Sequence, residues 1–311
     1  MPSITRRRFV QSAATAAAAA TLLPGRTAHA NPFNLPLGLQ LYSVREQLQR
    51  DYSGTLKQLH DIGFREVEAA GFFKQSPEDV QAAMAAAGLR CVSAHYPYAE
   101  LDKGLDAILD FHRKLGTAHF ILCSFPGFRP GASAATLPYG QQVKSFTLDD
   151  WRWNAERFNT WGKRIHDAGF QFGYHNHTME FAPQKDAASG ASIIPFDLLL
   201  QHTDPALVAI ELDCGWVTVG GGSPEHYLRT FPDRIKMLHV KDFASAPGHT
   251  SADNPPPAAE LGRGTSNYPA IFAAAKHGAI QHLFIEQEDY PDLPWAEALR
   301  TDARYLHSLK P

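Results

Sequence analysis

Short apolar runs alternate with helical patterns along the chain from Leu37 to Leu309. Eight such strand-helix units follow one another, and most of the runs are apolar at consecutive positions. Strands of this kind are buried on both faces, which is typical of a parallel sheet whose crossovers are helices. Eight units in one domain predict an α/β fold, a single closed (β/α)8 barrel or TIM barrel. A doubly wound open sheet is the alternative, but no Gly-x-Gly-x-x-Gly turn follows the first run.

Seven of the predicted strands cover residues 37–42, 64–68, 89–95, 117–123, 206–213, 234–240 and 282–286, and the fifth in order begins at Phe170. The predicted helices cover residues 53–63, 76–88, 101–115, 149–169, 195–202, 267–278 and 295–309, with one more that begins at Ser223. Capping residues support these limits. Ser76 and Pro77 suit the start of a helix, and Gly88 suits its end.

Residues 1–30 have the composition of an export signal. Arg6 to Arg8 precede an uncharged alanine-rich run, and Ala28-His29-Ala30 forms a small-x-small cleavage site before Asn31. The apolar run is shorter than the roughly 20 residues that a membrane-spanning helix needs. Paired arginines followed by x-Phe-Val resemble the twin-arginine signal of bacteria, although Gln11 replaces the usual lysine. We therefore expect a signal cleaved after Ala30, a catalytic domain in residues 31–311, a periplasmic location and the twin-arginine export machinery as a partner.

The charge of the remaining chain argues against nucleic acid as a partner. Residues 1–30 hold four arginines and no acid, so the rest has 25 basic and 32 acidic residues and a formal net charge of −7. A protein that binds phosphate backbones or anionic membranes usually shows a basic surface instead. The three cysteines, Cys91, Cys123 and Cys214, lie in or at the end of apolar runs, so we expect buried free thiols.

Polar residues stand where the predicted strands end. In a (β/α)8 barrel the carboxyl ends of the strands form the active-site face. One buried histidine or acid there usually satisfies a neighbouring backbone group. Polar residues at nearly every strand end indicate a site, because these ends converge on one mouth. The residues are Gln40, Glu68, His95, His175, His177, Asp213, His239, Lys241, Glu286 and Glu288.

The carboxylates at these ends point to a metal. Asp213 and Glu286 each end an apolar run. Ionised carboxylates in such places are costly unless they are paired or bind a cation. Two carboxylates, a histidine and one further carboxylate or histidine suit Mn²⁺, Mg²⁺, Co²⁺ or Zn²⁺. The ligand types exclude a closed structural zinc site.

Several motifs together resemble a known family. They are Tyr174-His175-Asn176-His177-x-x-Glu180-Phe181, Asp213-Cys214-Gly215-Trp216, His239-Val240-Lys241-Asp242, Leu261-Gly262-Arg263-Gly264 and Phe284-Ile285-Glu286-Gln287. In this order the chain is similar, from about Leu37 onward, to the sugar phosphate isomerase/epimerase group. This group of xylose isomerase-like TIM barrels also includes the endonuclease IV fold (the AP endonuclease 2 family).

The resemblance implies a metal held by Asp213, His239, Glu286 and a residue after the fifth strand. Better-known epimerases place a glutamate directly at that strand end, where this chain has His175. We expect Glu180 to reach back as the fourth ligand, with His175 or His177 as the alternatives. A loop residue that bonds to Asn176 is the plainer interpretation of Glu180.

The ligand set implies removal of a proton next to a carbonyl, with a divalent ion stabilising the enediolate that forms. Candidate bases are Glu180, His177 and His95. Lys241 would hold a substrate oxygen, or else carry a solvated charge at the barrel rim. Trp216 would stack on a sugar face, unless it is only a packing residue. The remaining expected substrate-binding residues are Gln40, Glu68 and His175.

The first functional prediction is therefore an isomerase or epimerase of a sugar or keto-sugar. An elimination or hydration that begins with the same proton removal, as in inosose dehydratases and 3-keto-glycoside lyases, is the alternative. A non-catalytic periplasmic sugar-binding protein is the second alternative. An export signal favours substrates without phosphate, and too few histidines for three metals disfavour an endonuclease. The sequence leaves the oligomeric state open, with a homo-oligomer among the alternatives.

Overall fold

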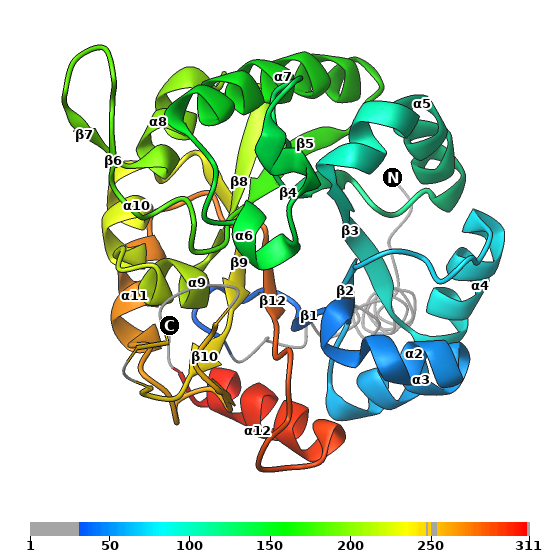
Figure 1. The fold of residues 1–311 in the computed structure, drawn as a ribbon. Coiled ribbons are helices and arrows are strands. Elements are labelled where there is room, and N and C mark those ends of the chain that lie inside the picture. Colours follow the sequence, from blue (N-terminus) through cyan, green and yellow to red (C-terminus); the bar gives the residue numbers. More distant parts are fainter. Residues whose placement is uncertain (1–30, 247, 250–253, 310–311) are drawn as a thin grey trace, which may run out of the picture.

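The structure, a computed structural model, describes residues 31–246, 248–249 and 254–309. The predicted signal in residues 1–30 lies outside these described residues. Eight parallel strands close into a barrel in the order β1-β12-β9-β8-β5-β4-β3-β2 (Figure 1). The predicted fold is thereby confirmed. The strands are β1 (Gly38–Gln40), β2 (Glu66–Ala69), β3 (Arg90–Pro97), β4 (Phe120–Phe125), β5 (Gln171–His175), β8 (Val208–Asp213), β9 (Ile235–Val240) and β12 (His282–Ile285).

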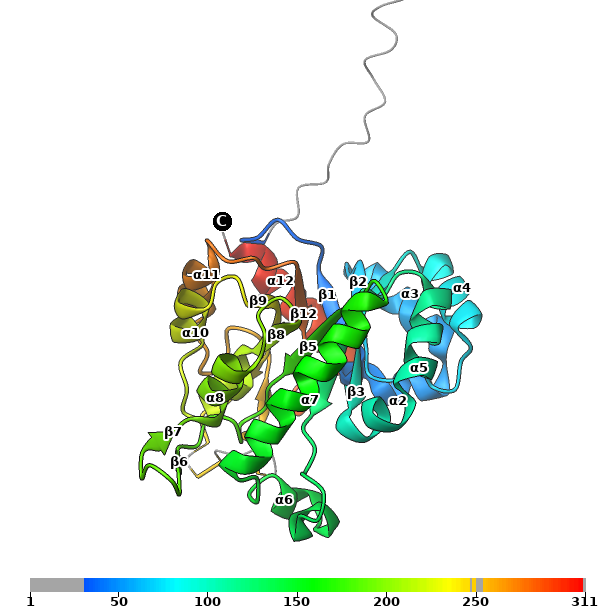
Figure 2. The same ribbon diagram turned by 90° about the horizontal axis from the view of Figure 1, so that it is seen from above.

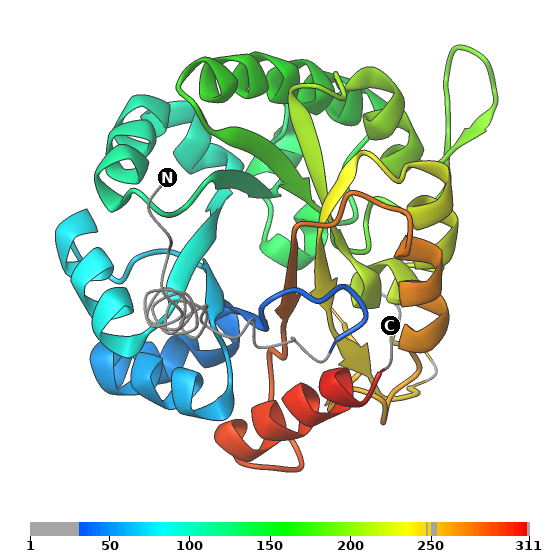
Figure 3. The same ribbon diagram turned by 180° about the vertical axis from the view of Figure 1, so that it is seen from behind.

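Helices surround the barrel, as Figures 1 and 3 show from its two ends. The caps expected from the sequence form. The Ser76 side chain accepts a hydrogen bond from the Asp79 N–H, and Gly88 ends the same helix in the left-handed conformation. The main helices are α3 (Tyr52–Ile62), α4 (Pro77–Ala87), α5 (Tyr98–Leu115), α7 (Leu148–Asp167), α8 (Pro195–His202), α10 (Pro224–Thr230), α11 (Tyr268–Ala275) and α12 (Trp295–Ser308).

Several short elements were not predicted, and most of them extend the loops that follow the strands. Leu41 and Tyr42, expected as the end of a strand, belong to the 3-10 turn η1 (Leu41–Val44), where the Gln40 side chain accepts a hydrogen bond from the Tyr42 N–H. Figure 2 shows α6 and the β6–β7 pair projecting at the end of the barrel opposite the C-terminal residues. The elements are α2 (Arg45–Arg50), η2 (Ser133–Thr136), α6 (Tyr139–Gln142), α9 (Cys214–Val219), β6 (Gln184–Lys185), β7 (Ser192–Ile193), β10 (Asp242–Phe243) and β11 (Ala258–Ala259).

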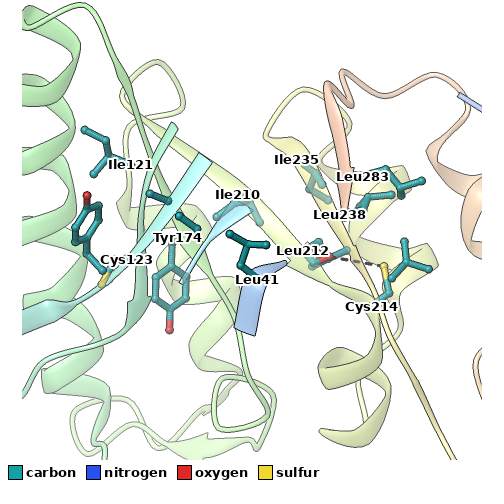
Figure 4. Close-up of a cluster of buried hydrophobic side chains, with 14 of the residues drawn as sticks. Leu41, Ile121, Cys123, Tyr174, Ile210, Leu212, Cys214, Ile235, Leu238 and Leu283 are labelled. Carbon is teal, nitrogen blue, oxygen red and sulfur yellow. Dashed lines mark hydrogen bonds between the residues drawn. The ribbon is translucent and has the colours of Figure 1, made fainter. Parts of the chain in front are cut away.

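Strand side chains alternate between the helices and the barrel interior. Ile210 and Leu212 of β8 belong to the large core between strands and helices (Figure 4), whereas Ala209 belongs to a separate cluster. That second cluster, which we call the lower interior layer, consists of Val92, Phe120, Leu122, Ala209, Met237 and Phe284. Gly173 is required on β5 because an added Cβ would lie 2.3 Å from Leu122 Cδ2. Two residues further along β8, along β9 and just past β12, the same face carries Glu211, His239 and Glu286.

The described residues also show the state of the cysteines and the apolar character of the helices. Cys91, Cys123 and Cys214 are buried and free, which confirms the prediction of unpaired thiols. Across the described ranges, the helices lack the combination of length and apolar character that a membrane span requires.

Candidate metal centre and its pocket

Four buried residues at strand ends bring metal-ligating atoms together. They are His175, Asp213, His239 and Glu286, and one ligand atom from each lies within 4.8 Å of the others. The Nδ1 atom of His239 is 3.0 Å from Glu286 Oε2 and 3.7 Å from Asp213 Oδ2. The structure thus groups three predicted ligands, Asp213, His239 and Glu286, with His175, which the sequence left as an alternative.

The atoms of this group fit a divalent cation. Asp213 Oδ1 accepts a hydrogen bond from the Trp216 N–H at 2.8 Å. Asp213 Oδ2 is buried and has no hydrogen-bond partner among the described residues. This oxygen lies 3.3 Å from Lys241 Nζ, and Asp213, Glu286 and Glu288 share that one ammonium group. A bound cation would offset the negative charge that Lys241 leaves uncompensated. Two carboxylates and two imidazoles are a donor set that Zn²⁺, Mn²⁺ or Co²⁺ accepts.

Glu180 lies outside this four-residue group. Its carboxylate accepts hydrogen bonds from the Tyr174 hydroxyl at 2.5 Å and from the His177 N–H at 3.0 Å. Burial raises the pKa of Glu180 to about 7. Nor does it bond to Asn176, whose side chain instead accepts from the Asp213 N–H at 3.0 Å. Glu180 therefore fixes the turn after β5, with its side chain directed toward Tyr174.

A second level of acids lies against the histidines. His239 Nε2 is 2.7 Å from Glu68 Oε1 and 3.2 Å from Glu211 Oε2. His175 Nδ1 is 3.1 Å from the same Glu211 oxygen, and His95 Nε2 is 2.7 Å from it. In metal sites, a ligating histidine usually donates its other ring N–H to a carboxylate, which orients the ring. Glu68 and Glu211 stand in that relation to the two candidate histidine ligands.

Glu68 is itself firmly held. Gln40 Nε2 donates to its Oε1 at 2.7 Å, and the Ser93 hydroxyl donates to its Oε2 at 2.5 Å. Burial alone would favour the neutral acid, but the charges and hydrogen bonds of His95 and His239 hold the pKa of Glu68 well below its usual range. Gln40 and Glu68 were predicted to bind substrate. The structure places both beneath the pocket, bonded to each other.

Lys241 is buried among carboxylates beside the candidate metal group. Its Nζ lies 2.6 Å from Glu288 Oε1, 2.9 Å from Glu286 Oε2 and 3.3 Å from Asp213 Oδ2. It also lies 4.6 Å from the centroid of the Trp216 ring. Although burial favours the neutral amine, these carboxylates raise the pKa of Lys241 above its ordinary value. A solvated rim charge is therefore not what the structure shows, because the side chain is 1% exposed.

A cavity of about 530 Å³ opens on this group. Of the predicted residues, His95, His175, His177, Trp216 and Glu286 line it. His177 Nδ1 is buried and has no hydrogen-bond partner within the described ranges, and burial lowers the pKa of this ring to about 4. The other lining residues are Tyr42, Ala70, Gly71, Pro97, Glu100, Ser124, Phe125, Gln142 and Glu288.

Sequence reasoning missed Glu211 and Tyr42. Glu211 precedes Asp213 by two residues on β8, so the alternation of strand side chains places both on the inner face. That alternation was the signal that could have identified it. Tyr42 follows β1 and lines the pocket from the 3-10 turn, which the apolar pattern of its segment did not predict.

Comparisons with known proteins agree with the barrel fold. A family model described as a xylose isomerase-like TIM barrel matches residues 56–309. An inosose dehydratase from Clostridium beijerinckii is 26% identical over 188 residues, which are 58% of this chain and 60% of that protein. The chain thus matches about 60% of the length of this curated relative.

Solved structures extend the similarity over most of the chain. A sugar phosphate isomerase/epimerase from Parabacteroides distasonis is 25% identical with a TM-score of 0.67, covering 88% of this chain and 94% of that one. The IolI protein, solved with a bound zinc atom, has a TM-score of 0.65 at 11% identity, with 87% and 96% covered. The prediction of an enzyme is confirmed at the level of the family, since the inosose dehydratase and the sugar phosphate isomerase/epimerase bear enzyme names.

Proposed function

The chain belongs to the xylose isomerase-like TIM barrel family, and we propose that it is a divalent-metal-dependent isomerase or epimerase of a sugar or keto-sugar. The observation that supports this most is the group of His175, Asp213, His239 and Glu286, of which His175 and Glu286 line the pocket. In this proposal His175 takes the ligand position for which the sequence favoured Glu180. A divalent ion held there would polarise a substrate carbonyl and offset the negative charge that develops when the neighbouring proton leaves.

The chain's own residues supply the proton transfers. His177 is the first candidate base, because its ring lines the pocket and its Nδ1 has no hydrogen-bond partner among the described residues. His95 is the second, and its Nε2 is engaged by Glu211 and Glu68, so a transfer by His95 would use Nδ1. Glu180 contributes indirectly by accepting the His177 N–H, which fixes the backbone that carries the candidate base.

An elimination is the second candidate function. The curated relative is named an inosose dehydratase, and loss of water begins with the same removal of a proton next to a carbonyl. The same ligand group serves both reactions. An isomerase returns a proton to the substrate, whereas a lyase expels water or an aglycone. A sugar-binding protein without catalysis is the third candidate, and it would use the pocket without needing the metal ligands.

The test uses the purified chain loaded with Mn²⁺, Co²⁺ or Zn²⁺ and a panel of keto-sugars and 3-keto-glycosides in deuterated water. An isomerase or epimerase incorporates deuterium at the carbon next to the carbonyl without loss of mass from the sugar. A lyase releases water or the aglycone. The proposal is wrong if the loaded chain does neither, while Asp213→Ala leaves sugar binding intact. That result would identify a binding protein.

We also propose export through the twin-arginine route, with cleavage after Ala30. The support is the sequence of residues 1–30 alone. In a bacterial host, the exported protein should begin at Asn31 when its amino terminus is measured by mass spectrometry. Replacing both Arg6 and Arg7 by lysine should retain the precursor in the cytoplasm. Unchanged export of that double variant would contradict the proposal.

A further inference from the structure

Apart from the Tyr42 phenol, the ionisable side chains that line the pocket are acids and histidines, and two of the acids pair with the buried Lys241 behind the wall. The lining includes the three acids Glu100, Glu286 and Glu288, and among the described residues no lysine or arginine belongs to it. Because Lys241 is held by two of these carboxylates, the lining offers a phosphate group no free cationic side chain, and Glu100 would repel an anion. A site that recognises phosphate usually offers arginine, lysine or a cluster of backbone N–H groups.

The nearest cationic side chains are already engaged. Lys241 lies within 3.3 Å of three carboxylates and is almost fully buried. Arg45 Nη1 donates to the carbonyl oxygens of Tyr42 and Glu288, and the guanidinium carbon lies 4.3 Å from the centroid of the Tyr42 ring. Lys241 therefore neutralises carboxylates of the pocket wall, and Arg45 holds the backbone and the ring of Tyr42 in place.

Aromatic rings supply the apolar part of the lining. Trp216 packs over Lys241 beside the metal group, and Phe125 lies near His177 with ring centroids 6.2 Å apart. Tyr42 is 43% exposed and is the one large apolar side chain in the described ranges that is exposed to this degree. An exposed ring at a pocket wall, supported by an arginine, is a rigid platform for the apolar face of another ring.

The size of the cavity exceeds one sugar. Its volume of about 530 Å³ lies within the usual range for small-molecule sites. A single hexose, with twelve non-hydrogen atoms at close packing, would occupy roughly 200 Å³. Space for a second ring therefore remains. The lining includes two aromatic residues, Tyr42 after β1 and Phe125 at the end of β4.

We propose that the pocket binds an uncharged sugar joined to a second ring, that is, a neutral glycoside, and discriminates against sugar phosphates and sugar acids. The reacting sugar would face His175 and Glu286, and the second ring would lie on Tyr42. The identity of the reacting ring rests on the proposed function, but the preference for a neutral two-ring ligand rests on the lining alone.

Isothermal titration calorimetry of the metal-loaded chain tests this proposal. The probes are 4-nitrophenyl glucosides, galactosides and mannosides of both anomers, disaccharides of the same sugars, the free hexoses and the hexose 6-phosphates. The best glycoside should bind at least tenfold tighter than its free hexose, and the hexose 6-phosphate should bind more weakly than the hexose. Tyr42→Ala should reduce the ratio of glycoside to hexose affinity to near one. Tyr42→Phe, which keeps the ring, should preserve most of the ratio.

Two results would overturn the proposal. One is a hexose 6-phosphate that binds more tightly than its hexose, and the other is a glycoside preference that is absent or survives in Tyr42→Ala. The outcomes also separate this inference from the proposed function. Tyr42-dependent glycoside binding without any deuterium uptake or elimination leaves the inference standing and removes the proposed function. Turnover of a free hexose or its phosphate without any preference for glycosides removes the inference and leaves the proposed function standing.

Discussion

Two pairs of buried carboxylates, only a few ångströms apart, differ in how their oxygen atoms are satisfied. The outer pair, Asp213 and Glu286, belongs to the candidate metal group, of which Glu286 lines the pocket. The inner pair, Glu68 and Glu211, lies against the opposite side of the His239 ring. His239 therefore joins the two pairs, with Nδ1 toward the outer acids and Nε2 toward the inner ones.

The inner acids bond to histidines, Gln40 and Ser93, whereas the outer acids lie against His239 and Lys241. Both Glu68 oxygens accept hydrogen bonds, and Glu211 Oε2 lies within 3.2 Å of three imidazole nitrogens. Asp213 Oδ2 has no hydrogen bond and faces Lys241. One inner oxygen, Glu211 Oε1, also lacks a partner among the described residues. Each pair thus has one oxygen without a hydrogen bond, and the outer pair differs in its position, because Glu286 lines the pocket and neither inner acid does. We therefore assign the ion to the outer pair and the orientation of the histidines to the inner pair.

The largest effect should follow a change in the outer pair. Asp213→Asn keeps an oxygen for the Trp216 N–H but removes the charge, so we expect metal affinity to fall by more than the roughly 100-fold that changes behind a ligand cause. Activity should be lost with it. Elemental analysis of the purified protein and kcat on the identified substrate measure both effects. Circular dichroism serves as the control for folding. A folded Asp213→Asn protein with full metal content would refute the assignment of the outer pair.

A smaller effect should follow a change in the inner pair. Glu211→Gln keeps the shape but weakens the acceptor that holds His175 and His239, so we expect a loss of roughly 10- to 100-fold in metal affinity. Competition against a chelator of known affinity measures this loss.

The matched control for that experiment is Glu66→Gln. Glu66 is buried on β2, two residues before Glu68, but it pairs with Arg90 and His282 toward the other end of the barrel. This change should lower stability and leave metal affinity unchanged. Equal losses of affinity in Glu66→Gln and Glu211→Gln would show that the inner pair acts only through general stability.

The same comparison explains what the sequence could predict. The eight-fold alternation predicted the barrel, and the end of each apolar run located Asp213, His239 and Glu286, because a parallel barrel brings all carboxyl strand ends to one face. Glu180 could not be placed in this way. It follows β5 by five residues, and the direction of its side chain depends on a turn whose contacts with Tyr174 and His177 are tertiary.

The depth of a residue along the barrel was also beyond the sequence. Gln40 and Glu68 were expected at the substrate because they end their runs, but neither lines the pocket. Gln40 bonds to Glu68, and Glu68 bonds to His239. Glu211 was overlooked because it lies within an apolar run. Inward alternation from Asp213 predicts its direction, but the register of β8 with β5, which pairs Glu211 with His175, is needed to place it beside the histidines.

A carboxylate away from the pocket sharpens the comparison, because it shows the cost of burial without an imidazole partner. Asp302 on α12 is 1% exposed, and its Oδ1 accepts a hydrogen bond from the Leu261 N–H at 2.8 Å. Burial raises its pKa from 3.8 to about 7, and the acids Glu260 and Asp242 add to this effect. Since the folded-state pKa exceeds the unfolded one, the folded state holds the proton longer and loses stability as pH rises between these values.

Asp302→Asn keeps the acceptor for the Leu261 N–H and removes the charge. At pH 4 the variant and the parent should be nearly equal in stability, because Asp302 is protonated in the folded parent. At pH 8 the variant should be more stable by about 1–3 kcal/mol, below the full value of about 4 kcal/mol that a pKa displaced to about 7 implies. Urea unfolding of both proteins at the two pH values, with chelator present, measures the difference. A stability advantage of equal size at both pH values would mean that packing rather than ionisation separates the two proteins. Burial without a charged partner would then not destabilise the ionised Asp302, in contrast to what we assume for the acids of the metal centre.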